Sequence, residues 1–362
     1  FMDRDGIPLS MCITSGSDNE QTTAIPLEKQ LTKMFKGKKF IYCADAGPGS
    51  LNIRNFNSMG GRAFIVTQSI KKLSDTLQQA VFSDTDYHLL SSDEPATIKD
   101  MKEFDRHDPQ NWDLYNDRIY KIIPADKTVD PGLYEEKAGK NGSVRKVKSK
   151  AVVPQKIIVS FSRKMMEYQR YIRNRQIERA KKLLKNLDPE TYKKGPHDVT
   201  RFIKRTSSTK SGEKITDQYT IDQSVIEEEE KYDGFYAVAT NLDDSAKDIL
   251  EVSANRYKIE DCFRMMKTNF SARPVFHQKR ERIIAHFMIC YTALLIYRLM
   301  EKKLDLHGTH YTADTLIETM KSMDVANIED MCYMSTYTSS EACTALNAIT
   351  GLGLDKKYYQ SK

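Results

Sequence analysis

The sequence has little that points to a secreted, zinc-binding or membrane protein. Its six cysteines are widely spaced and form no Cys-x2-Cys pair, which argues against a zinc site or a disulfide framework. The longest apolar run, residues 283–299, is interrupted by His286 and is shorter than the ~20 residues of a membrane span. No signal peptide is visible. We therefore expect a buried core helix at residues 283–299, a reducing cytoplasm, and no membrane partner.

Excess charge of one sign is also small, but it is unevenly distributed. The net charge is +6 over 362 residues, yet residues 137–194 contain 18 lysines or arginines and only 4 acidic residues. The rest of the chain is therefore acidic overall. A local cationic surface is typical of proteins that bind nucleic acid, although a basic helix can also serve solubility alone.

The beginning of the chain has the pattern of an α/β layer. Apolar runs at residues 7–14 and 39–44 predict two strands, and the spacing of apolar residues over 22–35 predicts a helix between them. A further strand is expected at residues 63–66, with Gln68 just beyond its end. This order of strand, helix and strand predicts a sheet covered by helices.

Asp45 is the first candidate functional residue. It directly follows the strand expected at residues 39–44 and precedes a Gly-Pro-Gly turn. A carboxylate at the carboxyl end of a central strand projects into the crevice where α/β proteins bind ligands. A turn or helix-capping role is equally typical of aspartate at such a place.

The middle of the chain, residues 83–231, has a different character. Strands are expected at residues 118–124 and 156–161, with a polar loop between them at 125–150 and a long basic helix at 163–187. On this helix aromatic residues alternate with cations: Tyr168, Arg170, Tyr171, Arg173 and Arg175. Aromatic rings stack on bases while cations hold phosphates, so this helix is a candidate nucleic-acid surface. The same spacing is also compatible with ordinary helix packing.

Residues 255–282 contain the strongest pattern. Ile259, Phe263 and Met266 recur at helical spacing and predict one apolar packing face. A neighbouring face contains one carboxylate among three cations, at Arg256, Glu260, Arg264 and Lys267. A solvated helix with ordinary ion pairs is the simplest interpretation. A metal-binding carboxylate flanked by phosphate-binding cations is the alternative.

The spacing Arg256-x3-Glu260-x6-Lys267, followed by ARPVFH at residues 272–277, resembles bacterial insertion-sequence transposases of the DDE class. This group has a Tyr-x2-Arg-x3-Glu-x6-Lys signature, and its tyrosine falls here on Ser253. Two further segments are similar to the family: the Ala-Asp-x-Gly that contains Asp45, and the Tyr-Asp-Gly-Phe-Tyr that contains Asp233.

The resemblance implies a ribonuclease-H-like mixed sheet flanked by helices, interrupted by a basic α+β insertion before the helix of the catalytic glutamate. The corresponding divisions are residues 1–82 for the first part of the core, 83–231 for the insertion, 232–303 for the second part, and 304–362 for a helical tail.

The resemblance also implies a chemistry. Asp45 and Glu260 would be the second and third acids that hold Mg²⁺ or Mn²⁺, with Asp233 a lesser candidate. Arg256, Arg264 and Lys267 would contact DNA, with the basic helix as a further surface. The expected partners are the terminal inverted repeats of the element, target DNA, and a second copy of the chain on paired ends. The expected location is the bacterial nucleoid.

The family's first aspartate is expected a few dozen residues before the segment Gly-Ile-Pro-Leu at residues 6–9. The chain begins only a few residues before that segment, so we expect an N-terminally incomplete transposase with little or no activity alone. Two other functions remain open: a nuclease of the same fold without strand transfer, and a transposase-derived protein that only binds DNA or dimerises.

Overall fold

The computed structural model describes residues 1–3, 5–16, 18, 20–34, 40–45, 47, 49–129, 134–138, 144–148, 151–185, 195, 198–210, 213–329 and 331–360. The contacts between Cα atoms divide the chain into two compact units. One unit is residues 37–253, and the other combines residues 1–36 with residues 254–362. Each unit is described by itself.

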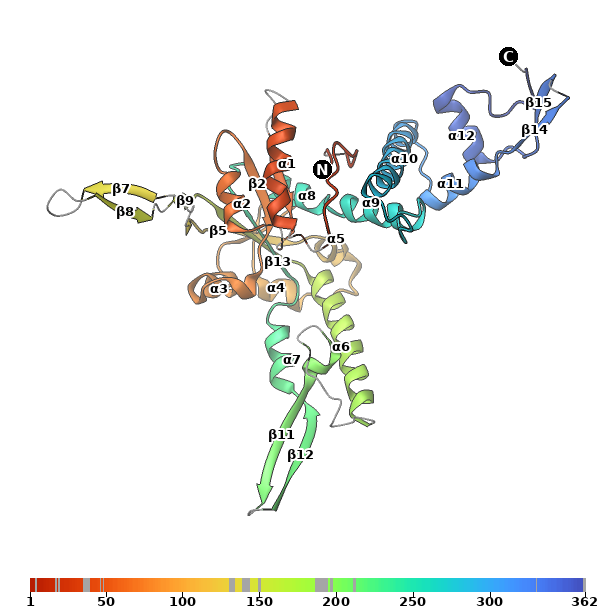
Figure 1. Cartoon of the computed structure of the whole chain (residues 1–362). Coiled ribbons are helices and arrows are strands. Elements are labelled where there is room, and N and C mark those ends of the chain that lie inside the picture. Colours follow the sequence, from red (N-terminus) through yellow and green to blue (C-terminus); the bar gives the residue numbers. More distant parts are fainter. Residues whose placement is uncertain are drawn as a thin grey trace. The chain divides into compact units, whose positions relative to one another are not determined.

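A seven-stranded mixed sheet is the centre of the 37–253 unit (Figure 1). Its strands lie in the order β1 (Ile41–Ala44), β2 (Ala63–Thr67), β13 (Phe235–Thr240), β10 (Lys156–Phe161), β5 (Ile119–Pro124), β3 (Tyr87–Leu89) and β4 (Pro95–Ala96). β1 and β2 are parallel, and the other neighbouring pairs are antiparallel. β13 joins β2 to β10, and β10, β5, β3 and β4 all lie within residues 83–231, so the segment expected as an insertion also contributes strands to the central sheet.

The core lies on both faces of this sheet because side chains alternate along each strand. Phe64 and Val66 of β2 belong to the larger cluster, which includes residues of α3 (Asp75–Phe82) and α4 (Ile98–Glu103). Ile65 belongs to a smaller cluster on the other face, with Ile249 and Leu250 of α8 (Ala246–Ala254). The predicted class, a mixed sheet flanked by helices, is confirmed.

Shorter elements connect these strands. They are α2 (Leu51–Phe56), η1 (Ile70–Lys72), η2 (Pro109–Asn111) and α5 (Trp112–Asn116). The predicted polar loop at residues 125–150 is wrong. Three strands lie there: β7 (Tyr134–Ala138) pairs with β8 (Val144–Lys148), and β6 (Lys127–Val129) pairs with β9 (Ala151–Val153), which directly follows these residues; both pairs are antiparallel. These strands were missed because β7 and β8 are rich in charged residues, whereas strand prediction relies on apolar runs.

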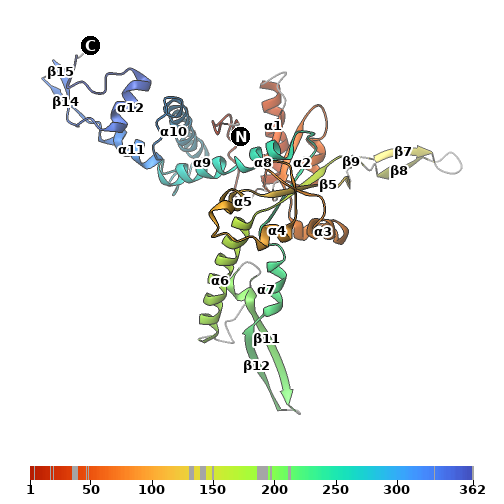
Figure 2. The ribbon, with the colours of Figure 1, turned by 180° about the vertical axis from the view of Figure 1, so that it is seen from behind.

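The basic helix α6 (Arg163–Lys185) belongs to a subdomain with its own small core. η4 (Val199–Phe202), the hairpin β11 (Ile203–Lys210) and β12 (Glu213–Ile221), and α7 (Gln223–Glu230) complete it. Ile177 and Ala180 of α6 pack there against Phe202, Ile203 and Ile226. The hairpin extends away from the central sheet in both views (Figures 1 and 2).

The other unit is mostly helical. It contains α1 (Glu20–Met34), α9 (Tyr257–Thr268), α10 (Arg280–Leu306), α11 (Ala313–Ser322) and α12 (Glu341–Thr350). A three-stranded antiparallel sheet follows the order β14 (Val325–Ile328), β15 (Cys332–Ser335) and β16 (Tyr358–Gln360). Its core joins α9, α10, α11 and α12 through residues that include Met265, Leu294, Leu316 and Leu346.

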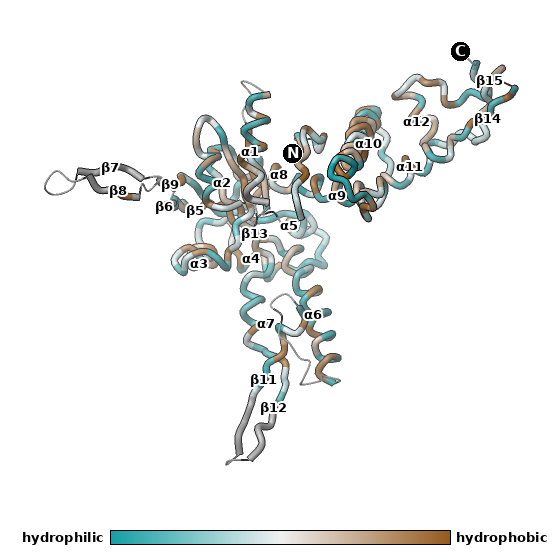
Figure 3. The backbone as a smooth tube through the Cα atoms, in the orientation of Figure 1, coloured by the Kyte–Doolittle hydropathy of each residue, from teal (hydrophilic) through white to brown (hydrophobic). Residues whose placement is uncertain are grey.

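α10 contains a long apolar stretch, as the brown colour along it shows (Figure 3). One side packs in the core through residues such as Leu294 and Tyr297, while Ile289 and Ile296 are exposed. The prediction of a buried core helix is therefore right for one side of α10 only. By length and composition α10 is also the one helix among the described residues that would be able to cross a membrane, which is weak support for a span.

The strand predicted at residues 7–14 is not formed. Met2 and Pro8 form an isolated bridge, and the backbone N–H of Leu9 donates to the carbonyl oxygen of Phe1. The carboxylate of Asp3 accepts hydrogen bonds from the backbone N–H groups of Asp5 and Ile7. These local bonds use donors that a strand would offer to a sheet, so the segment folds back on itself.

Candidate functional site

Asp45 lies where the sequence predicted it, directly after the last residue of β1, and its side chain is exposed. The chain then passes through Gly49 into α2. A Cβ atom at Gly49 would lie 3.0 Å from the Cβ of Val66 and 3.1 Å from the carbonyl oxygen of Asp45. Glycine at position 49 therefore lets the Asp45 turn, of which residues 45, 47, 49 and 50 are described, pack closely against β2.

Arg54 of α2 ties this turn to the sheet. Its Nε donates to the carbonyl oxygen of Gly49 at 2.9 Å. Its Nη1 donates to Oε1 of Gln68 at 3.0 Å and to Oε1 of Gln155 at 3.1 Å. Gln68 follows β2 and Gln155 precedes β10. The turn is thus connected to two strand ends through one guanidinium, a role that sequence patterns did not indicate.

The charge of Arg54 has neutral partners. Its three hydrogen-bond acceptors among the described residues are carbonyl oxygens, and Arg54 is 7% exposed. Burial lowers the pKa of the Arg54 guanidinium to about 10. It therefore still has its proton at neutral pH, and the Asp45 turn is held by a cation rather than by a neutral group.

Glu260 lies in the first turn of α9, with its side chain exposed. The partial positive charge of a helix N-terminus favours a carboxylate there. The packing face predicted for this helix is wrong, because Cys262 and Met265 are the buried residues while Phe263 is exposed. The error is a rotation of the packing face, and Glu260 remains on the exposed side.

α9 is fixed to α10 by a second buried arginine. Arg298 of α10 donates from Nε to Sγ of Cys262 and from Nη2 to Oδ2 of Asp261, the residue next to Glu260. Its Nη1 donates to Glu301 of its own helix. Burial alone would lower the pKa of Arg298, but the hydrogen bonds to Glu301 and Cys262 raise it. The helix that presents Glu260 is therefore anchored one residue beyond it.

The cations around Glu260 differ in their surroundings. Arg264 and Lys267 are exposed, and Arg264 forms an ion pair with Asp261. Arg256, at the N-cap of α9, is half-buried. Ser253 is buried, and its Oγ lies 3.0 Å from the hydroxyl of Tyr236 on β13.

Asp45 and Glu260 belong to different units. Among the described residues, no group of three histidine, cysteine or acidic side chains lies together in a way that would hold a metal ion. The carboxylates of Asp45 and Glu260 are oxygen donors of the kind that Mg²⁺ and Mn²⁺ prefer, so their chemistry fits such an ion.

The predicted cations of α6 separate into two kinds. Arg170 and Arg175 are exposed, and the Arg175 guanidinium lies 5.7 Å from the ring centre of Tyr171. Arg173 is 5% exposed and forms a two-pronged ion pair with Asp233, with both N···O distances at 2.7 Å. Its buried pairing gives Arg173 a structural role in place of the predicted contact with DNA.

Asp233 has the complementary role. Besides Arg173, Arg170 lies 3.5 Å from its Oδ2. The next residue, Gly234, has φ of +83°, and a Cβ there would lie 2.6 Å from a ring carbon of Phe161. The Tyr-Asp-Gly-Phe-Tyr motif thus forms a tight turn that is locked to α6 by an ion pair.

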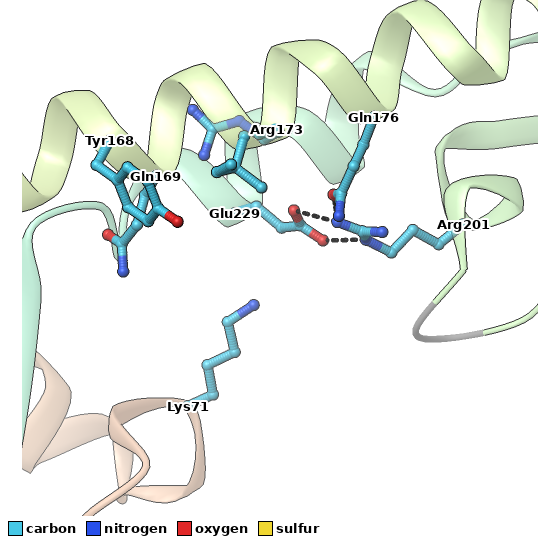
Figure 4. Close-up of a pocket in the computed structure, with 8 residues that line it drawn as sticks. Lys71, Tyr168, Gln169, Arg173, Gln176, Arg201 and Glu229 are labelled. Carbon is cyan, nitrogen blue, oxygen red and sulfur yellow. Dashed lines mark hydrogen bonds and ion pairs between the residues drawn. The ribbon is translucent and has the colours of Figure 1, made fainter. Parts of the chain in front are cut away.

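A shallow, open pocket of ≈ 320 Å³ lies beside this ion pair (Figure 4). Lys71 of η1 lies opposite Tyr168, Gln169 and Gln176 of α6. Arg201 of η4 forms a 2.7 Å ion pair with Glu229 and donates to Gln176. Lys71 and Arg201 stand far from α6 in the sequence, so the pattern on that helix did not reveal them.

A family model described as a transposase DDE domain matches residues 1–296. No curated protein matches the chain significantly. The match supports the ribonuclease-H-like character of the mixed sheet, with a divalent metal and DNA as the general requirements of the family. Because the match extends over most of the 362 residues, the protein belongs to the transposases with a DDE domain.

Proposed function

We propose that this protein cleaves the ends of a bacterial insertion sequence and joins them to target DNA. The observation that supports it most is the placement of two exposed carboxylates in a chain of this family. Asp45 ends a strand of the central sheet, and Glu260 begins a helix fixed by a buried arginine.

In this proposal Asp45 and Glu260 each give carboxylate oxygens to Mg²⁺ or Mn²⁺. A bound divalent ion would activate the attacking hydroxyl or water and neutralise the leaving oxygen. The chain's own contribution is to hold the two carboxylates in fixed positions. Hydrogen bonds to Gly49 and Asp261, made by Arg54 and Arg298, support those positions.

We assign the contact with DNA to the exposed cations of both units. Around Glu260 they are Arg264 and Lys267, with the half-buried Arg256 beside them. On α6 they are Arg170 and Arg175, and the pocket in Figure 4 adds Lys71. Cations on separate elements suit a duplex, because phosphates recur along both strands. The duplexes would be the terminal inverted repeats and the target, in the bacterial nucleoid.

The divisions predicted from the sequence, 1–82, 83–231, 232–303 and 304–362, remain part of this proposal, with β3, β4, β5 and β10 of residues 83–231 assigned to the catalytic sheet. Two copies acting on paired ends complete it. Exposed apolar residues of α10, spaced as on one side of a helix, support pairing between copies: Ala285, Ile289, Ile296 and Leu299. Light scattering of the chain with and without terminal-repeat DNA tests this part, and a single copy on paired ends would contradict it.

The test of function is a strand-cleavage and joining assay on DNA with the element's terminal repeats. It uses both this chain and the product of the whole reading frame that contains it. Asp45→Asn and Glu260→Gln should each abolish Mg²⁺-dependent cleavage by the whole product, while Asp18→Asn serves as the matched control on an exposed aspartate.

Three outcomes distinguish the functions. Cleavage and joining that depend on both carboxylates support the transposase. Cleavage without joining identifies a nuclease, and DNA binding without either reaction identifies a non-catalytic protein. Full activity in either carboxylate variant contradicts the site.

A further inference from the structure

Arg54 has a position that packing alone does not explain. A charged side chain is rarely buried without an acidic partner, because removing its charge from water is costly. Arg54 is buried, and its hydrogen bonds go to three carbonyl oxygens from three separate segments. An apolar residue would fill the same space without this cost, so the hydrogen bonds themselves are the reason for an arginine there.

Two of the three acceptors, Gly49 and Gln68, lie beyond the carboxyl ends of β1 and β2, where Asp45 also lies. The third, Gln155, precedes the amino end of β10, which runs parallel to β2. Gln155 extends the network, because its Nε2 donates to the carbonyl oxygen of Ala125, just after β5. A planar guanidinium has donors in a rigid fork, which lets one side chain fix several oxygens at once.

The bonds from Arg54 to Gln68 and Gln155 join residues that are 87 positions apart in the sequence. α2 also contacts β6 and β9, the strand pair that lies next to Gln155 in the sequence. The helix that carries Arg54 is thus held between the Asp45 turn and the first strand pair of the insertion. A substitution of Arg54 would therefore first change the positions of the Asp45 turn and of the β6–β9 strand pair.

We propose that Arg54 is a positioning residue for Asp45, holding the Asp45 turn against the ends of β2 and β10 so that the carboxylate is placed for a divalent metal. This inference rests on the proposed function of Asp45. The metal site itself is an expectation of the family, whereas the role of Arg54 comes from its hydrogen bonds in this chain.

The test measures metal binding directly, without catalysis. Fe²⁺ with ascorbate generates hydroxyl radicals at a bound iron, which cut the backbone next to the site. In the unmodified chain we expect cuts near residue 45 that excess Mn²⁺ suppresses. Asp45→Asn should remove these cuts.

Arg54→Met keeps the length of the side chain and removes all three hydrogen bonds. Groups that orient metal ligands typically change metal affinity on the order of 10- to 100-fold, so the half-saturating Fe²⁺ concentration should rise at least about tenfold. Arg54→Lys keeps the charge but not the fork, and should give a smaller rise. Arg62→Met is the matched control, because within the described part of the chain the Arg62 guanidinium donates to the carbonyl oxygen of Phe56 alone, six residues earlier.

Circular dichroism would show whether Arg54→Met is folded. A second variant keeps the test decisive if it is not. Gln68→Leu removes the Oε1 acceptor that the half-buried Gln68 offers to Arg54. It should therefore also raise the half-saturating Fe²⁺ concentration. If Asp45→Asn abolishes the cuts while the folded Arg54 and Gln68 variants bind iron as the unmodified chain does, the positioning role of Arg54 is refuted and the metal role of Asp45 stands. If the cuts persist in Asp45→Asn, or never occur near residue 45, the proposed metal role of Asp45 fails and the inference fails with it.

Discussion

The buried pair of Arg173 and Asp233 allows a test of whether Asp233 is structural or catalytic. Both side chains are 5% exposed, and two hydrogen bonds of 2.7 Å join them. Asp233→Ala would leave the Arg173 guanidinium buried beside only the half-exposed Glu230, whose Oε1 lies 3.1 Å from Nη2. Removing one partner of a buried ion pair typically costs 3–5 kcal/mol. Because Glu230 compensates part of the charge, we expect a loss of about 3 kcal/mol, the lower end of that range.

Urea unfolding followed by tryptophan fluorescence suits this measurement. Trp112 is the only tryptophan, and it lies on α5 in the same unit as the ion pair. Urea is uncharged, so it does not screen the pair as guanidinium chloride would. Glu178→Gln is the control, because it breaks an exposed ion pair with Lys181 on α6 and should change the midpoint little.

The double variant Arg173→Met/Asp233→Ala separates the cost of an unpaired charge from the value of the pair. With neither charge buried, it should be more stable than Asp233→Ala alone. The reasoning is refuted if Asp233→Ala unfolds at the midpoint of the unmodified chain, or if the double variant is no more stable than the single one. An Asp233→Asn variant that stays stable but loses DNA cleavage would instead make Asp233 a catalytic acid.

Three further predictions follow from the described contacts. Gly234→Ala should lower the free energy of unfolding, measured in urea, by about 2–4 kcal/mol, because φ is positive at this position and the added Cβ would overlap the ring of Phe161. Burial would raise the pKa of Asp261, but hydrogen bonds from Arg264 and Arg298 lower it overall. The stability this group gives is therefore present above the ordinary aspartate pKa of ~4 and lost as pH falls below it, a dependence that Asp261→Asn should flatten in acid unfolding. Arg175→Gln should reduce the slope of log affinity for DNA against log salt by about 0.9, the contribution of one phosphate contact, and an unchanged slope would exclude this residue.

Strands in the central sheet were predictable because their signal is local. The apolar runs before Asp45 and at residues 63–66 and 156–161 became β1, β2 and β10. Each is short, rich in branched residues and bounded by turn residues. The run at residues 7–14 has the same local character but forms no strand. Strand formation requires a partner as well as a pattern, and the bonds that Asp3 accepts from Asp5 and Ile7 keep this segment folded on itself.

The sequence could not predict which residues pair with the buried arginines. Arg173 has the spacing of a nucleic-acid helix, but its partner Asp233 lies 60 residues further along the chain. Arg54 stands in an ordinary short helix, and its acceptor Gln155 is 101 residues away. Helical spacing tells which residues share a face, and it contains no information on which face meets a distant carboxylate or carbonyl. The fold alone distinguishes a buried cation from an exposed one with the same spacing.

Two buried arginines give the candidate acids separate supports. Arg54 reaches the Asp45 turn within the 37–253 unit, and Arg298 reaches Asp261 beside Glu260 within the other unit. Neither network contains a residue of the other unit. Substitutions at sites that share no partner usually change stability additively within about 0.3–0.5 kcal/mol, so the losses that urea unfolding measures for Arg54→Met and Arg298→Met should add in the double variant. A double variant that departs from this sum by more than that margin would show that the two networks are coupled and that the supports are not separate.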